Sequence, residues 1–142
     1  MDTDTSAKEA NRAVRNMVRH GTVSSTNPEM MMARVVFEEK DGNVSAELHV
    51  LTRGSGGNRD YWMPDVGDEV VCLYQADDEE SATGWILGTY FTEKHKPNAS
   101  SQDIRRIDFG DGSFFEFNRA AGSLTIKCTG PIKVNGSTIN LN

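Results

Sequence analysis

Long apolar runs are missing from this 142-residue sequence, and no stretch reaches the roughly 18 consecutive apolar residues that indicate a membrane-spanning helix. The first residues, MDTDT, are acidic and lack a hydrophobic segment, so we expect no signal peptide. Cysteine is also scarce: Cys72 and Cys128 have neither CxxC spacing nor a neighbouring histidine. This pattern predicts two reduced, half-buried thiols in a protein made in a cytosol.

Basic residues are too few to favour nucleic-acid binding. The net charge is −6, and residues 1–97 carry 10 basic and 17 acidic residues, a net −7. Residues 98–142 carry 5 basic and 4 acidic residues, a net +1. Aromatic residues make up 8% of the chain, which is too sparse for a surface that stacks on bases. Because nucleic-acid binding needs a basic surface, we expect no nucleic-acid partner.

The N-terminal segment, residues 1–21, is expected to form a helical arm. Ser6 followed by Glu9 fits a capping box for a helix over residues 6–20, and Gly21 fits a glycine at its end. Apolar side chains fall on one face and cations on a second stripe. The two sets are Ala7, Ala10, Val14, Met17 and Val18, and then Lys8, Arg12, Arg15 and Arg19. The basic stripe is interpreted either as a solvated face or as a docking arm for an acidic partner.

Residues 22–97 carry longer strand patterns. Strands are expected over residues 30–38, 44–52, 70–74 and 85–91. The loops between them include a hairpin turn at residues 39–43, a flexible glycine-rich loop at 54–58 and an acidic loop at 77–80. Four or five antiparallel strands in about 75 residues suit a small Greek-key barrel of the OB-fold type.

Residues 98–142 begin as a polar linker and continue as short strands. Apolar and polar residues alternate around Leu124, Ile126 and Cys128, around Ile132 and Val134, and around Ile139 and Leu141. Such alternation marks strands with one buried face. Because strands this short bury little and leave open edges, winding together with identical chains is the economical solution. The chain as a whole is therefore expected to be all-β: an N-terminal helix, a barrel, and a tail that intertwines with identical chains as part of a fibre or needle.

Several motifs, in this order, resemble the phage baseplate assembly protein V family, the central spike of contractile phage tails. They are VRHGTV at 18–23, ARVVF at 33–37, WMPDVGDEV at 62–70, GWILGTY at 84–90 and FGDGS at 109–113. The resemblance covers about residues 14–130, and the tryptophan–proline motif followed by the glycine–tryptophan motif is its most specific part. The signature residues are Gly21, Trp62, Pro64, Gly67, Gly84, Trp85, Gly88, Asp111 and Gly112. Trp62 is expected to cover a barrel end, and Gly84 and Gly88 to lie where backbones approach closely.

The resemblance implies a homotrimer that acts mechanically, with C-terminal tails that form an intertwined trimeric β-helix or prism. Three barrels would form a collar, joined to baseplate hub proteins and the tail tube, and three tails would wind into a needle that contacts the target cell's outer membrane. The residues expected to form the trimer core are Leu124, Ile126, Ile132, Val134, Ile139 and Leu141. Such a protein would be assembled in the bacterial cytoplasm and become part of a phage tail or a phage-tail-like particle.

The C-terminal residues depart from several members of that family. Those members end in an H-x-H pair that binds iron, whereas His20, His49 and His95 are dispersed and no histidine follows residue 95. We therefore expect no metal and no other cofactor. The tail is short, and Asn140, Leu141 and Asn142 would leave a blunt three-fold platform for a separate tip protein of the PAAR-repeat type.

Catalysis is not expected, because no motif with catalytic spacing occurs and the chain leaves no room for an inserted lysozyme domain. The acidic loop lacks the spacing of a calcium site. Two other functions stay open at this point. One is a monomeric OB-fold module that binds a glycan or an oligonucleotide, with Tyr61 and Trp62 stacking on sugar rings. The other, supported only by weak groupings of Asp and Glu, is a small wall-degrading hydrolase.

Overall fold

The structure is a computed structural model that describes residues 3–38, 42–76 and 83–142. The chain divides into two compact units, Met1–Lys94 and His95–Asn142. The division into arm, barrel and tail at residues 21 and 97 stays a prediction. The acidic loop at 77–80 lies outside the described residues, as does most of the hairpin turn at 39–43. In the described part of the chain, no helix is long and apolar enough to cross a membrane.

The arm begins as α1 (Thr3–Met17) and passes without a linker into β1 (Val18–Asn27). The predicted end of the helix at Gly21 is therefore wrong. Gly21 is buried in β1, where an added Cβ would lie 2.4 Å from the carbonyl oxygen of Val36 and 2.7 Å from Cγ1 of Val35. The position requires glycine because two strands approach closely, and this requirement is independent of helix capping.

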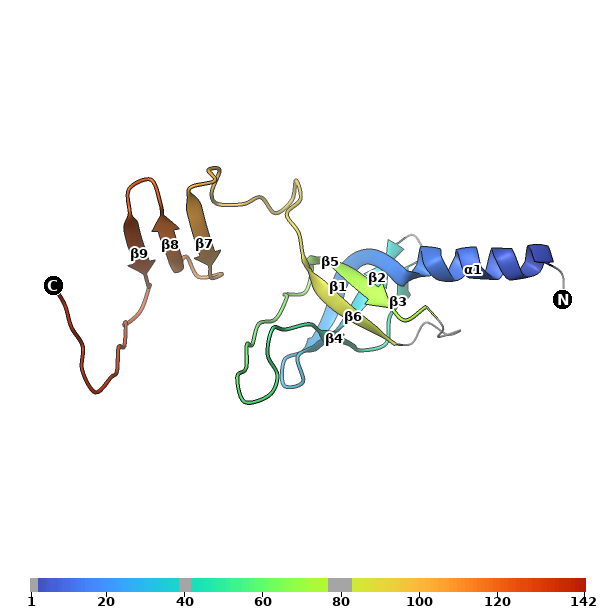
Figure 1. Ribbon diagram of the computed structural model, residues 1–142, viewed down its shortest axis with the longest axis horizontal. Coiled ribbons are helices and arrows are strands. Elements are labelled where there is room, and N and C mark those ends of the chain that lie inside the picture. The colour runs from blue at the N-terminus through green and yellow to red at the C-terminus, as the bar shows by residue number, and fades with distance from the viewer. Residues whose placement is uncertain (1–2, 39–41, 77–82) are drawn as a thin grey trace. The chain divides into compact units, whose positions relative to one another are not determined.

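The first unit contains a closed five-stranded barrel (Figure 1). Its remaining strands are β2 (Met32–Phe37), β4 (Leu48–Val50), β5 (Glu69–Tyr74) and β6 (Gly84–Thr89), while β3 (Asn43–Val44) pairs with β2 outside the ring. The ring runs β1-β5-β6-β4-β2 and closes where β2 pairs with β1. The β4–β6 pair is parallel, and the other pairs are antiparallel. This closed Greek-key arrangement is consistent with the predicted OB-fold.

The long strand β1 closes the barrel by pairing on both sides. Residues Val18–Thr22 pair with β5, and residues Thr22–Asn27 pair with β2. The register shifts between Val23 and Ser25, and such irregularities increase strand bending and twist. A single strand can thus leave one neighbour and join the other, which removes the open edges from the ring.

Alternating residues of the barrel strands build the core. In β5, Val70, Cys72 and Tyr74 are buried and alternate with half-buried residues. The buried side chains of the hydrophobic core cluster are Val23, Ala33, Val35, Phe37, Leu48, Val50, Val70, Cys72, Tyr74 and Ile86. In β2 the buried positions are Ala33, Val35 and Phe37, and Met32, which we expected to face inward, is only half-buried. This period-two pattern is what a sheet with one inner face requires.

The glycine-rich loop predicted to be flexible is held by hydrogen bonds. The N–H of Asp60 donates to the carbonyl of Gly54 at 3.0 Å, and Ser55 and Arg59 form an isolated β-bridge. The side chains of Arg53 and Asp60 form an ion pair at 2.8 Å across its base. Glycine serves close packing here, because a Cβ on Gly54 would lie 2.7 Å from the carbonyl oxygen of Asn58.

The second unit contains a three-stranded antiparallel meander. Its strands are β7 (Ile104–Asp108), β8 (Phe114–Asn118) and β9 (Ser123–Lys127), in that order. The strands predicted around Val134 and Ile139 are absent from the single chain, in which residues 128–142 carry no strand. Short segments need a neighbouring backbone to pair with, and within this chain they have none.

The two cysteines differ in exposure, which corrects the prediction that both are half-buried. Both are free; Cys72 is buried in the barrel and Cys128 is exposed in the tail. Burial raises the pKa of the Cys72 thiol to about 11, with the positive charge of Arg19 opposing that rise.

Because the thiolate is the reactive form, native Cys72 is expected to resist alkylation at about pH 8, whereas Cys128 should react. Mass spectrometry of iodoacetamide-treated protein, native and unfolded, checks this expectation. Modification of native Cys72 at the rate found in the unfolded chain would contradict it.

Candidate functional site

One face of the tail sheet is apolar and uncovered in the single chain. Ile107 of β7 lies opposite Phe115 of β8, which lies opposite Ile126 of β9. Phe117 lies opposite Leu124, two residues further along the same strands. Residues directly opposite one another in an antiparallel pair share a face, so these five side chains form one surface, which we call the apolar tail face. Arg105 of β7, opposite Phe117, lies on the same face beside them. The exposed fractions of the five apolar side chains run from 41% for Phe117 to 58% for Ile107.

The apolar tail face has no cover within its own unit. Residues 95–142 are all described, and not one of them is buried. A three-stranded sheet whose apolar face meets water is poorly stable alone, because burial of that face supplies most of the favourable free energy. The unit is therefore incomplete as a single chain.

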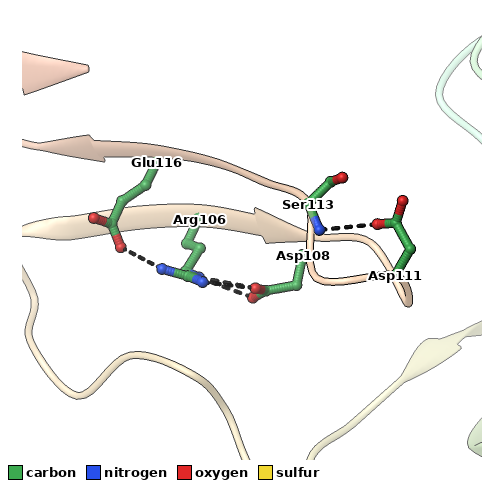
Figure 2. A network of polar contacts seen from close by, with 5 residues as sticks. All are labelled: Arg106, Asp108, Asp111, Ser113 and Glu116. Atoms are coloured by element: carbon green, nitrogen blue, oxygen red, sulfur yellow. Dashed lines mark hydrogen bonds and ion pairs between the residues drawn. The ribbon is translucent and has the colours of Figure 1, made fainter. Parts of the chain in front are cut away.

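The opposite face of the same sheet is polar and internally paired (Figure 2). The Arg106 guanidinium donates to Glu116 at 2.9 Å and to Asp108 at 2.9 Å, and it lies 3.8 Å from the centre of the Phe114 ring. The hydrogen bond to Glu116, helped by Asp108, raises the pKa of Arg106 further above its already high value. Guanidinium groups bridge two carboxylates well, because their donors form a planar fork. Ile104 and Phe114 share this face with the charged row, and Arg106 and Glu116 are only 20% and 24% exposed.

The turn between β7 and β8 is stabilised by Asp111, which the sequence had singled out together with Gly112. The N–H of Ser113 donates to the Asp111 carboxylate at 2.9 Å, and so does the Thr129 hydroxyl at 2.9 Å. Gly112 has a φ of +94°, a conformation that favours glycine. Asp111 thus ties the β7–β8 turn to the residues that follow β9.

These hydrogen bonds predict a pH dependence for the tail. The bond from the Ser113 N–H, followed by that from Thr129, lowers the pKa of Asp111 below its ordinary value of 3.8. A lowered folded-state pKa contributes stability above the unfolded-state pKa, and this contribution is lost as the pH falls through the folded-state pKa. We expect the melting temperature of the tail to fall less between pH 5 and about pH 2.5 in Asp111→Asn than in the wild type. An equal fall in both proteins would contradict this role for Asp111.

The tryptophan–proline motif lies in the connection between β4 and β5 and packs on the barrel. Trp62 is half-buried against the core, and its indole N–H donates to the Leu51 carbonyl at 3.1 Å. Pro64 is buried, and Gly67 has a φ of +96°. The N–H of Gly67 donates to the carbonyl of Val23 at 2.9 Å, so the motif fastens this connection to β1.

The glycine–tryptophan motif forms β6, but its two glycines differ. A Cβ on Gly84 would lie 2.8 Å from the Tyr74 ring, which confirms the predicted close approach. A Cβ on Gly88 would meet nothing within 4 Å, so the predicted close approach at that position is wrong. Gly88 lies instead beside a register irregularity, where Val71 pairs with Gly88 but Cys72 pairs with Ile86. Trp85, which lies between the two glycines in the sequence, is half-buried.

The predicted trimer-core residues fall into two groups. Leu124 and Ile126 lie in the apolar tail face, whereas Ile132, Val134, Ile139 and Leu141 are exposed in the segment without strands and are not brought together. The proposed tip platform, Asn140–Asn142, lies in that same segment, and Leu141 is 91% exposed. Ile107, Phe115 and Phe117 share the apolar tail face but were not among the predicted trimer-core residues. Their alternation with Arg106 and Glu116 was the signal that could have identified them.

Metal and sugar binding receive little support from the described residues. Among them, no group of three or more His, Cys, Asp and Glu side chains is placed to hold a metal ion. Of the two aromatic residues considered for sugar stacking, Trp62 packs on the core. Tyr61 is 65% exposed, and its hydroxyl donates to the Pro28 carbonyl at 2.8 Å.

Comparison with known proteins agrees with this geometry. Residues 19–91, half of the chain, match the family described as the type VI secretion system/phage-baseplate injector OB domain. The chain is also 32% identical, over 127 residues, to a protein named the spike protein of Escherichia phage P2. That alignment covers 89% of this chain and 57% of the relative, so the chain spans less than two thirds of the relative's length. The matched residues begin in β1 and end just beyond β6, and they include the whole ring of five strands. With its barrel matched from the first strand to the last, the chain belongs to the type VI secretion system and phage-baseplate injector OB-domain family.

Proposed function

We propose that this protein is the central spike of a contractile tail baseplate and that it functions as a homotrimer. The observation that carries the proposal is the apolar tail face, which lies uncovered on a sheet whose other face is polar and paired. Three such faces turned toward a common axis would bury Ile107, Phe115, Phe117, Leu124 and Ile126 from each chain. Burial of that area would supply the stability that the single tail lacks.

The mechanical role follows from the trimer. Tail contraction would drive the spike through the envelope of a target cell, so the spike must resist unfolding under load. The segments around Val134 and Ile139, which have no strand partner in one chain, would find partners in the other two. Strands paired between chains cannot detach singly, and closed pairing leaves no open edge. The outward polar row around Arg106 would keep the prism soluble.

A role as the central spike implies further protein partners in the baseplate. The barrels would form a collar attached to baseplate hub proteins and the tail tube, within a phage tail or a related particle. We also propose a separate tip protein of the PAAR type, with Asn140, Leu141 and Asn142 as the residues expected to contact it. No enzymatic step is part of the proposal.

Localisation within a purified particle tests the proposed role. Antibody raised against the barrel and coupled to gold should label contractile tails at their baseplate end. Particles from cells in which this gene is deleted should lack the label and fail to kill or infect, and the intact gene should restore both. Normal killing by particles that lack the protein would overturn the proposal.

A further inference from the structure

The arm helix α1 projects from the barrel with little contact to it (Figure 1). Along residues 4–17, for which exposure is described, only Ala13, Asn16 and Met17 are half-buried, and the others are exposed. Isolated helices of about 15 residues are marginal in water, and most helices in proteins are stabilised by packing of one face. A 15-residue helix so little packed on its own barrel is expected to be packed on something else.

The junction with the barrel fixes the direction of this helix. The Nε–H of Arg19 donates to the carbonyl of Asn16 at 3.1 Å, which satisfies one of the last carbonyls of the helix. The same guanidinium lies 4.4 Å from the centre of the Tyr74 ring and 5.6 Å from that of Phe37. Cation–π contacts of this kind hold the cation over the ring face. Because β1 follows α1 directly, the arm is presented in one orientation instead of hanging from a linker.

One face of α1 carries the spacing of a helix–helix seam. Ala7, Ala10, Val14 and Met17 follow one another at intervals of three, four and three residues. This is the heptad spacing that brings two positions per repeat onto a shared axis between helices. Ala7 and Ala10 are exposed, Val14 is 66% exposed, and Met17 is half-buried where the helix meets the barrel. We call these four residues the arm seam.

The charges of α1 are placed so that copies of the helix can approach one another. Lys8, Arg12 and Arg15 lie on the side of the helix away from the arm seam. They are three or four residues apart and therefore share a face. That face is offset from the arm seam by about half a turn around the helix axis. Like charges would repel if they met at the centre of a bundle. With the cations outside and an uncharged seam inside, identical helices can pack seam to seam.

We propose that the arm seams of three copies pack together as a parallel three-helix bundle at the N-terminal end of the spike. In each copy, the arm seam would thus be covered by α1 of the other two copies. This inference rests on the trimer in the proposed function, because a three-fold assembly holds the three arms parallel and at high local concentration. Helices of only two heptads would not associate on their own, but in the trimer they can.

Cysteine cross-linking of the full chain tests this packing. In a Cys128→Ser background, Val14→Cys places a thiol in the arm seam, and the matched variant Arg12→Cys places one on the opposite face. Two cysteines are bridged only where their Cα atoms lie within roughly 7 Å. Under a mild oxidant, Val14→Cys should form disulfide-linked dimers at least about tenfold faster than Arg12→Cys. The yield should reach about two thirds of the chains, since a third cysteine has no partner.

The mass of the purified protein in solution distinguishes a failure of the helix bundle from a failure of the trimer. A trimer in which Val14→Cys cross-links no faster than Arg12→Cys would overturn the bundle and leave the spike proposal standing. That result would mean that another protein covers the seam or that nothing does. A monomer would overturn both. Hydrogen exchange gives a second measurement on the unaltered trimer: α1 amides should be protected, and exchange as fast as in an unfolded peptide would also overturn the bundle.

Discussion

Replacing Ile126 with lysine is expected to convert the proposed trimer into single chains of 15.7 kDa. Ile126 lies in the apolar tail face on the edge strand β9, opposite Phe115, and would face the common axis of that trimer. The substitution would place one ammonium group from each of three chains close together in an apolar interior. Burying an unpaired charge costs several kcal/mol, and three like charges add repulsion. Light scattering after gel filtration gives the mass directly.

The neighbouring residue provides a matched control. Thr125 lies in the same strand but on the polar face, opposite Glu116. Thr125→Lys adds the same charge next to a carboxylate and in contact with water, so the trimer should persist with unchanged mass. If both lysine variants stayed trimeric, the apolar tail face would not be the interface. If both became monomers, the effect would come from charge in β9 and not from the face on which it lies.

Replacing Gly21 with alanine is expected to destabilise the barrel by about 3 kcal/mol or more, a large loss for a small domain. The added Cβ would lie 2.4 Å from the carbonyl oxygen of Val36 and 2.7 Å from Val35. The first of these atoms belongs to the backbone, so the two strands must separate to admit it. The chain's two tryptophans, Trp62 and Trp85, both lie in the barrel unit. Denaturant unfolding followed by tryptophan fluorescence therefore reports on the barrel alone.

Gly88→Ala is the control for the Gly21 variant. A Cβ there would meet nothing within 4 Å, and the backbone does not require glycine. The barrel's free energy of unfolding should stay unchanged or rise by up to about 1 kcal/mol, because glycine carries an entropic cost within a strand. Equal destabilisation by both alanine variants would contradict the assignment of Gly21 as the close-approach position.

The barrel strands could be predicted from the sequence only in part. Strands expected over residues 30–38, 70–74 and 85–91 overlap β2, β5 and β6, whereas the strand expected over residues 44–52 is divided into β3 and β4, and β1 was not among the expected strands. The alternation of Val70, Cys72 and Tyr74 identified a half-buried strand, and the structure has β5 there. The helix end was missed because Gly21 fits two roles, a helix stop and a close contact between strands. The contact partner, Val36, lies in another strand and could not be inferred from local sequence. Gly88 was misread for a similar reason, since a β-bulge depends on the register of two strands.

For the tail, the sequence predicted only which residues of a strand share an apolar face. The alternation around Leu124 and Ile126 predicted a strand with one apolar side, and the structure places both residues on such a side. The strands expected around Val134 and Ile139 are not formed in the single chain, where residues 128–142 carry no strand. In the proposed trimer, the other two chains would supply their hydrogen-bonding partners. The network of Arg106 with Asp108 and Glu116 was also missed, since it requires the β7–β8 register.

The absolute mass of the purified full-length protein, measured by light scattering across a hundredfold dilution, tests the trimer most directly. An uncovered apolar tail face predicts a mass of three times 15.7 kDa that persists at the lowest concentration. A species of 15.7 kDa with the tail sheet still folded would contradict the trimer, and with it the proposed spike.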